Sequence, residues 1–327
     1  MKAWRVTKTG SPTDVLQMQD IPVPEPIAGT MRVRVLATGI GLPDSLMCHG
    51  NYPFTPQHPF TPGQEVCGIV TDANGSNEFQ IGQRVMGVTA FIEGYGGFAE
   101  EALVYSDNAF LVPDSMADND AAVFSIAYRT GYIALVTRGK IQTGETLLVH
   151  GASGGTGMAA IQLGKALGGR VIAVARGAEK TQQCLRLGAD KVIDSGSEDF
   201  VEQVGAMTHG AGVDLVYDPV GGDTFKRSLA CLAYGGRVLA IGFSSGSWGD
   251  ASTQDLALSN HSVIGVLATV PTHDMSLSIQ QALYELYEQG KIAPFIKHTR
   301  GANALPEALV ELEQRRVIGR SVIVMNE

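Results

Sequence analysis

Residues 144–165, GETLLVHGASGGTGMAAIQLGK, decide the fold of this chain. The apolar run 146–150 is typical of a buried strand, and a glycine-rich turn leads directly from it into a helical pattern over about 155–168. Glycines in the turn allow the backbone to approach a pyrophosphate, and Gly157 allows the helix to pack closely. Free N–H groups and the helix dipole then attract the anion. We therefore predict a dinucleotide site formed by Ser153, Gly154, Gly155, Thr156 and Gly157.

The rest of this half repeats the same alternation of strand and helix. Apolar runs recur at 170–175, 191–194, 213–218 and 237–243, with helix-like stretches between them, and 262–267 could add a further strand. Alternating strands and helices indicate βαβ units around a parallel sheet that is covered on both faces. The second half is therefore expected to be a doubly wound α/β domain.

Residues 1 to about 122 have a different pattern. Short strands with period-two alternation, such as MRVRVLATGI at 31–40, are broken by proline and glycine. Closely spaced short strands predict a compact, barrel-like β unit. The closing segment SVIVM at 321–325 is also strand-like, and we expect the C-terminal tail to return to this first domain.

Composition excludes several functional classes. A net charge of −9 over 327 residues argues against a nucleic-acid-binding surface, which is usually basic. Four scattered cysteines without paired spacing favour a reducing compartment over a disulfide framework. The first ten residues, MKAWRVTKTG, contain no apolar signal region, and we find no run long enough to span a membrane. We expect a cytoplasmic protein.

The end of the second apolar run bears on the choice of cofactor. An acidic residue is normal here when the cofactor is NAD, because it binds the ribose 2′-hydroxyl. In this chain Ala175 stands at that position, Arg176 follows, and Lys180 lies one helical turn later. Two cations and a missing carboxylate favour a 2′-phosphate, and hence NADP(H). The alternative is a solvated helix start whose basic residues are incidental.

These motifs resemble the medium-chain dehydrogenase/reductase superfamily, and within it the zinc-independent quinone oxidoreductase branch. The signature of that branch is matched by Gly144, Glu145, Leu148, Ala152, Ser153, Gly154, Gly155, Gly157, Gln162 and Lys165. Further matches are PGQE at 62–65, YGGFAEE at 95–101, LGAD at 187–190 and YDPVGGD at 217–223. The resemblance implies an α/β chain with a GroES-like β-barrel domain (1–122 and 268–327) and a doubly wound Rossmann NADP-binding domain (123–267).

The same resemblance implies further positions and an assembly. Thr130, in the segment YRTGY, matches a hydroxyl residue near the nicotinamide carboxamide, and Gly242 and Phe243 match the turn beside the nicotinamide. Most members are dimers or tetramers joined through their cofactor domains. A homodimer is therefore expected by analogy.

Zinc-dependent relatives carry a cysteine in a GxCxxD run and a histidine in a GHE run. Here the segments read GIGLPD and GQE, so Gly41 replaces the cysteine and Gln64 replaces the histidine. Neither replacement supplies the thiolate or imidazole that a catalytic zinc requires. Cys48 and His49 are adjacent, their side chains diverge in regular structure, and we predict no metal site.

Without zinc ligands, alcohol oxidation is disfavoured, and hydride delivery to an electron-poor acceptor remains. For an enone or enoyl acceptor, a proton donor near the carbonyl would help, and Tyr52 in the run GNYP is the candidate. It matches a tyrosine shared by quinone-type members. The alternative role for Tyr52 is an aromatic wall of the pocket or core.

Other polar residues have two interpretations. Asp44 matches a family aspartate in the substrate pocket, but after Pro43 it could also be a helix N-cap. Relatives commonly have asparagine where Gly41 stands, so a polar contact of the pocket is missing here. Glu65 and His150 are interpreted as structural residues.

Three functions therefore remain open. The first is NADPH-dependent reduction of quinones, and the second is NADPH-dependent reduction of α,β-unsaturated carbonyls or enoyl thioesters. The third is a cofactor-binding structural or regulatory protein with little turnover. In the first two, the partner is a small-molecule electron acceptor.

Overall fold

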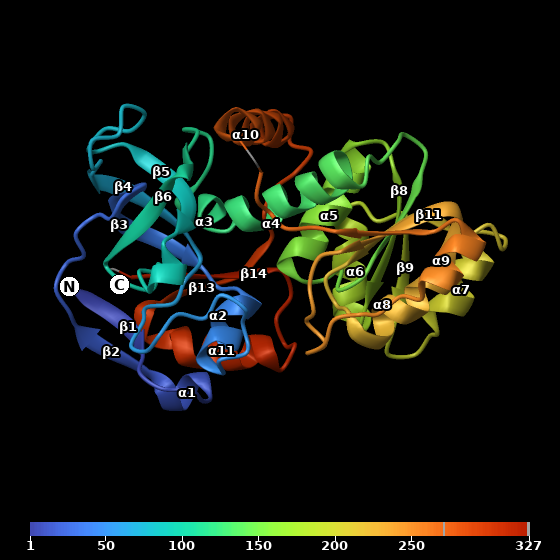
Figure 1. Cartoon of the computed structure of the whole chain (residues 1–327), viewed down its shortest axis with the longest axis horizontal. Coiled ribbons are helices and arrows are strands. Elements are labelled where there is room, and N and C mark those ends of the chain that lie inside the picture. Colours follow the sequence, from blue (N-terminus) through green and yellow to red (C-terminus); the bar gives the residue numbers. More distant parts are fainter. Residues whose placement is uncertain (271, 326–327) are drawn as a thin grey trace. The chain divides into compact units, whose positions relative to one another are not determined.

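The computed structural model describes residues 1–270 and 272–325, which form two compact units (Figure 1). The first unit contains residues 1–126 and the tail from Pro294, and the second is Ala127–Ala293. The structure therefore assigns 268–293, which the sequence analysis placed in the first domain, to the second unit. The reason is α10 (His273–Glu288), in which Ser276 accepts hydrogen bonds from Arg129 on its carbonyl oxygen (3.2 Å) and Oγ (2.9 Å).

A closed barrel forms the centre of the first unit. Strand β3 (Thr30–Gly39) pairs with both β4 (Glu65–Asp72) and β6 (Glu101–Leu111), and this double pairing closes the sheet on itself. Along β3, Val33 and Val35 are buried while Arg34 is exposed, as the alternation predicts. The remaining strands are β5 (Arg84–Thr89), β14 (Arg320–Val324) and β13 (Ile296–Gly301). The expected barrel and the return of the tail are confirmed.

Shorter elements complete this unit. They are β1 (Lys2–Val6), α1 (Pro12–Val15), β2 (Leu16–Asp20), α2 (Leu42–Cys48), η1 (Phe91–Glu93), α3 (Asp118–Ala121), η4 (Ala302–Ala304) and α11 (Leu305–Glu313). Met47 of α2 shares a hydrophobic core with Leu305 and Leu309 of α11. The tail therefore contributes to the same core as the N-terminal half.

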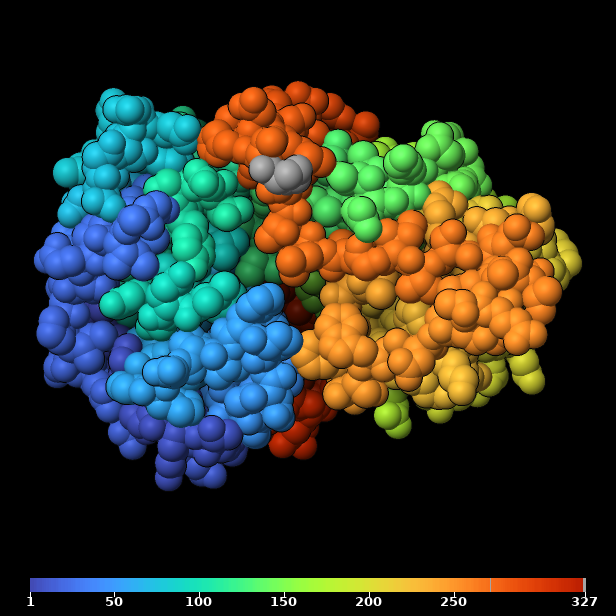
Figure 2. All heavy atoms as spheres, viewed as in Figure 1, coloured from blue at the N-terminus to red at the C-terminus, as the bar shows by residue number. Residues whose placement is uncertain are grey.

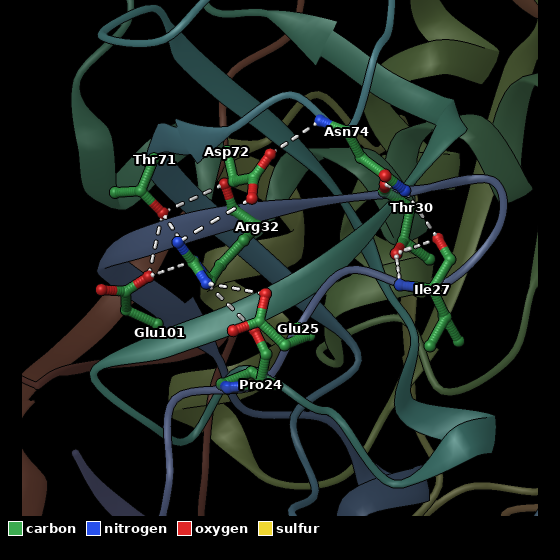
Figure 3. A network of polar contacts seen from close by, with 9 residues as sticks. All are labelled: Pro24, Glu25, Ile27, Thr30, Arg32, Thr71, Asp72, Asn74 and Glu101. Carbon is green, nitrogen blue, oxygen red and sulfur yellow. Dashed lines mark hydrogen bonds and ion pairs between the residues drawn. The ribbon is translucent and has the colours of Figure 1, made fainter.

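Arg32 of β3 forms ion pairs where the barrel closes, between β3 and β6 (Figure 3). Its Nε lies 3.0 Å from a carboxylate oxygen of Glu101 on β6, and its other nitrogens lie 4.0 Å from Asp72 at the end of β4 and 4.0 Å from Glu25. Thr71 donates a hydrogen bond of 2.9 Å to the same Glu101 carboxylate. This partly buried cation connects the two strands that pair with β3.

The second unit is a six-stranded parallel sheet in the order β12-β11-β10-β7-β8-β9. Its strands are β7 (Thr146–Val149), β8 (Arg170–Ala175), β9 (Lys191–Asp194), β10 (Val213–Asp218), β11 (Leu232–Ala240) and β12 (Ser262–Gly265). The first three strands build one half of the sheet and the last three build the other, with the order reversing between β7 and β10. This is the doubly wound Rossmann arrangement that the sequence predicts.

Helices connect and flank these strands. They are α4 (Phe124–Tyr132), the π-helix η2 (Ile133–Arg138), α5 (Gly155–Ala166), α6 (Ala178–Arg186), α7 (Phe200–Met207), α8 (Gly222–Ser228), η3 (Leu229–Cys231), α9 (Thr253–Ser259) and α10. Leu148, Val216 and Val238 are fully buried on three neighbouring strands. The segment containing α9 and β12 lies on the surface of the face shown in Figure 2, in orange. Within the described residues, no helix is long and apolar enough to cross a membrane.

Candidate functional site

The glycine turn after β7 forms a tight approach between backbone segments. A Cβ atom at Gly157 would lie 2.4 Å from the carbonyl oxygen of Gly151 and 2.8 Å from the Cα of Ala152, so only glycine fits. Gly154 is the N-cap of α5, and within the described residues no side chain caps this helix. The first-turn N–H groups, including those of Gly155 and Thr156, are therefore available to an anion. Ser153 lies half-buried in the turn itself.

The predicted 2′-phosphate site lies at the end of the neighbouring strand β8. Ala175 is buried, Arg176 is exposed directly after it, and Lys180 lies half-buried on α6. Asp194, at the end of β9, lies near Arg176, and its carboxylate accepts hydrogen bonds from the amide nitrogens of Gly177 (2.8 Å) and Gly196. These two hydrogen bonds, with the charge of Arg176, lower the pKa of Asp194. Arg176 therefore lies close to the Asp194 carboxylate, directly after β8.

The carboxyl ends of β10 and β11 lie at the same edge of the sheet as the glycine turn after β7. Gly242 and Phe243 follow β11, and a Cβ at Gly242 would lie 3.0 Å from the carbonyl oxygen of Pro219 after β10. Asp218 stabilises that turn by accepting hydrogen bonds from two amide nitrogens through Oδ1, while its Oδ2 is buried without a partner among the described atoms. Thr130 is buried in α4 of the same unit. The predicted cofactor-binding residues therefore lie on four separate segments of the second unit.

In the first unit, Tyr52 is half-buried among aromatic rings. Its ring meets Phe54 edge-on at 5.7 Å between centroids and Phe91 at 6.5 Å. Burial raises the pKa of the Tyr52 hydroxyl, and the neighbouring Gln64 side chain lowers it in part. Gln64 is itself 6% exposed, and its Nε2 makes no hydrogen bond to any described atom. The phenol stays protonated at neutral pH beside the Gln64 side chain.

Asp44 connects two backbone loops around this tyrosine. Its Oδ2 accepts a hydrogen bond from the amide of Gly41 (2.8 Å), and its Oδ1 accepts one from the amide of Gly63 (2.9 Å). The sequence analysis offered Asp44 as an N-cap; the structure corrects this, because Gly41 is the N-cap of α2 and Asp44 is its third residue. Complete burial raises the pKa of Asp44 to about 7, although both N–H donors oppose the rise.

The cysteine and histidine of the same segment have separate environments. Cys48 is buried, while His49 Nε2 lies 2.9 Å from Glu313 Oε1 on α11, which also accepts a hydrogen bond from Ser45. Among residues 1–270 and 272–325, no cluster of three histidine, cysteine or acidic side chains could hold a metal ion. His49 therefore joins α2 to the C-terminal tail.

Glu65 and His150 are both buried and make polar contacts within the protein. Glu65 is buried, and its carboxylate pairs with Arg320 and accepts a hydrogen bond of 2.9 Å from the amide of Ile126. His150 is buried, its Nε2 lies 2.8 Å from Ser228 Oγ, and burial lowers the pKa of its imidazole to about 3.

Sequence reasoning missed two contributions to these sites. Gly151 adopts a φ of +56°, and the residue that follows β7 and His150 thereby turns the chain toward α5. A glycine directly after an apolar run was the available signal. The position of Gln64 beside Tyr52 had no signal in the sequence beyond the zinc-ligand comparison.

Comparisons with known proteins agree with this geometry. Residues 28–114 match the alcohol dehydrogenase GroES-like domain, and residues 155–283 match the zinc-binding dehydrogenase family. A quinone oxidoreductase-like protein 2 homolog from Nematostella vectensis is 34% identical over 304 residues, covering 90% of this chain and 82% of the relative. The Escherichia coli quinone oxidoreductase, solved in complex with NADPH, superposes with a TM-score of 0.91 at 29% identity over 99% of this chain and 100% of that one.

The chain belongs to the medium-chain dehydrogenase/reductase superfamily. Its relatives place it in the zinc-independent quinone oxidoreductase branch, and it is an oxidoreductase. The resemblance to this superfamily predicts that Gly41 and Gln64 stand at the positions where zinc-dependent members hold their metal. In this member, the Asp44 carboxylate stabilises the backbone at one of these positions, and Tyr52 lies beside the other.

Proposed function

We propose that this chain is an NADPH-dependent reductase that delivers hydride to quinones without zinc. The observation that carries this proposal is the glycine turn before α5, which no described side chain caps, together with buried Ala175 at the end of β8 and exposed Arg176 directly after it. A carboxylate at position 175 would repel a 2′-phosphate, whereas Arg176 attracts it. The NADPH complex of the Escherichia coli relative supports the same cofactor.

The residues of the second unit bind and orient this cofactor. Amides of Gly155, Thr156 and Gly157 hold the diphosphate, and Arg176 and Lys180 hold the 2′-phosphate. The turn of Gly242 and Phe243, together with Thr130, positions the nicotinamide. When bound, NADPH supplies the hydride, and the protein contributes orientation and electrostatic stabilisation.

A second acceptor class is favoured by the environment of Tyr52. Its phenol is half-buried, stays protonated at neutral pH, and lies beside the amide of Gln64. A protonated phenol can donate a proton to the carbon or oxygen of a reduced enone, a step that an enone or enoyl thioester requires. Reduction of α,β-unsaturated carbonyls is therefore the alternative function, with Tyr52 as proton donor.

One experiment separates these functions. NADPH oxidation is followed in parallel with a quinone, an enal, an enone and an enoyl thioester, and the reduced product is identified. Turnover with the quinone alone supports the first function, and a saturated β-carbon with Tyr52→Phe lowering that rate supports the second. Tight NADPH binding without acceptor-dependent oxidation contradicts both and favours a low-turnover binding protein.

The assembly belongs to the same proposal. Strand β12 is an edge of the Rossmann sheet, and exposed apolar side chains lie on and around it, namely Leu258 (76% exposed), Val263 (38%) and Leu267 (62%). Edge strands with apolar neighbours favour pairing with another chain. We expect a homodimer through β12, which Val263→Pro should dissociate in sedimentation measurements. All four cysteines are free and buried, which supports a cytoplasmic location.

A further inference from the structure

Two aromatic side chains follow the carboxyl end of β11 and contact each other. The rings of Phe243 and Trp248 lie 4.8 Å apart between centroids, with their planes inclined by 32°. Trp248 is 55% exposed, whereas the other tryptophan of the chain, Trp4, is 9% exposed. A large aromatic surface is therefore presented to solvent on the second unit.

The loop that carries Trp248 is fixed by its neighbours. The amide of Ser245 donates a hydrogen bond of 2.9 Å to the carbonyl oxygen of Val220. Gly249 packs directly on the ring of Phe225 in α8, where an added Cβ would lie 2.3 Å from the ring atoms. The indole is thus held on an ordered turn, which reduces the entropy lost when a ligand binds to it.

The aromatic pair lies at the edge of the sheet where ligands bind in this fold. In open parallel sheets, ligands occupy the carboxyl ends of the strands near the point where strand order reverses. The diphosphate turn follows β7, and Arg176 follows β8 on one side of it. Phe243 and Trp248 follow β11 on the other side, with β10 between them and the turn. By strand order, the pair therefore follows a strand on the opposite side of the glycine turn from Arg176.

We propose that Phe243 and Trp248 form an aromatic platform for the flat ring of the electron acceptor, and that Trp248 makes the enzyme selective for aromatic quinones. The inference rests on the proposed function and specifies its substrate class. An offset aromatic contact contributes about 0.5–1.5 kcal/mol beyond area burial. Because 1.4 kcal/mol is about tenfold in affinity, this predicts a change of about two- to tenfold.

The test compares Trp248→Ala and Trp248→Phe with the wild type. The ratio of kcat/KM for 1,4-naphthoquinone to that for methyl vinyl ketone, a small non-aromatic acceptor, should fall about two- to tenfold in the alanine variant, mainly through KM. The phenylalanine variant should recover part of the loss. Tyr234→Ala is the matched control, because Tyr234 is 85% exposed but lies near the start of β11, away from its carboxyl end.

A second measurement does not depend on turnover. Naphthoquinone, titrated in the presence of NADP⁺, should quench tryptophan fluorescence saturably in the wild type and not in Trp248→Phe, which retains only buried Trp4. Equal selectivity in the alanine variant and the wild type, or a loss that is the same for both acceptors, would overturn the platform while leaving quinone reduction intact. A changed oligomeric mass of the alanine variant would also overturn it, by assigning Trp248 to a subunit contact. A wild type that reduces no quinone would instead overturn the proposed function.

Discussion

Glu65 and Arg320 form a buried ion pair between positions 255 residues apart in the chain. Glu65 begins β4 and Arg320 begins β14, so the pair attaches the C-terminal tail to the barrel. The Glu65 side chain is 1% exposed and that of Arg320 is 12% exposed. Burial raises the pKa of Glu65, and Arg320 opposes that rise.

Removing one member of this pair should destabilise the first unit strongly. Arg320→Leu leaves the buried Glu65 carboxylate without its cationic partner, which typically costs about 3–5 kcal/mol. The matched control is Arg300→Leu, because Arg300 pairs with Glu311 in the same unit at 23% and 38% side-chain exposure. A partly exposed pair of this kind is expected to contribute much less, about 0–1 kcal/mol as for surface ion pairs. Urea unfolding should therefore separate the two variants, and equal losses would contradict this role of Arg320.

The buried carboxyl of Asp44 should make stability depend on pH. Its pKa is raised to about 7 in the folded chain from an ordinary value of 3.8, so the folded state keeps a proton that the unfolded state releases. The contribution of the protonated Asp44 carboxyl to the free energy of unfolding is fully present below about pH 3.8. It is lost as the pH rises through about 7. The unfolding free energy of the wild type minus that of Asp44→Asn should fall from pH 5 to pH 8.

The slope of this difference is at most about 1.4 kcal/mol per pH unit. Asp114→Asn, at an exposed position of the same unit, provides the control variant. A difference that does not change between pH 5 and pH 8 would show that Asp44 is ionised in the folded chain across this range.

Gln64 should cost stability and contribute to activity. Its buried Nε2 makes no hydrogen bond to the described atoms, and such a group costs about 1–3 kcal/mol. Gln64→Leu should therefore be at least as stable as the wild type, yet slower with an enone, because the Tyr52 hydroxyl loses its polar neighbour. Thermal unfolding and enone-dependent NADPH oxidation check the two effects, with exposed Gln57→Leu as control. A strongly destabilised leucine variant would argue against an unpaired amide.

The fold was accessible to sequence reasoning because it depends on local patterns. The apolar run before Gly151 and the helical stripe after Gly154 predict β7 and α5, and repeats of this pattern predict the parallel sheet. The site contacts depend instead on loops distant in sequence. Nothing local to Asp44 indicates that it accepts a hydrogen bond from Gly63, and nothing near His49 indicates Glu313.

The domain boundary illustrates the same limit. The composition of residues 268–293 is equally compatible with either unit, because an amphipathic helix can pack on a barrel or on a sheet. In the structure α10 belongs to the second unit, where the buried Arg129 donates hydrogen bonds to Ser276.

Cofactor selection should depend on the cation after β8. Arg176→Ala should weaken NADPH binding about tenfold, equivalent to 1.4 kcal/mol, and leave NADH binding nearly unchanged, because only NADPH carries the 2′-phosphate. Equilibrium titration of both cofactors measures this. Arg186→Ala is the control, because Arg186 is exposed at the far end of α6 and its replacement changes the net charge by the same amount. Equal weakening of NADPH and NADH would remove Arg176 from phosphate recognition.

The most direct test of hydride delivery from NADPH to a quinone is the initial rate of cofactor oxidation by the wild-type protein with and without 1,4-naphthoquinone. We predict saturable, quinone-dependent oxidation of NADPH, with a kcat/KM at least about tenfold higher than with NADH, the factor expected from a single phosphate contact. A rate of NADPH oxidation that quinone does not increase would contradict the account.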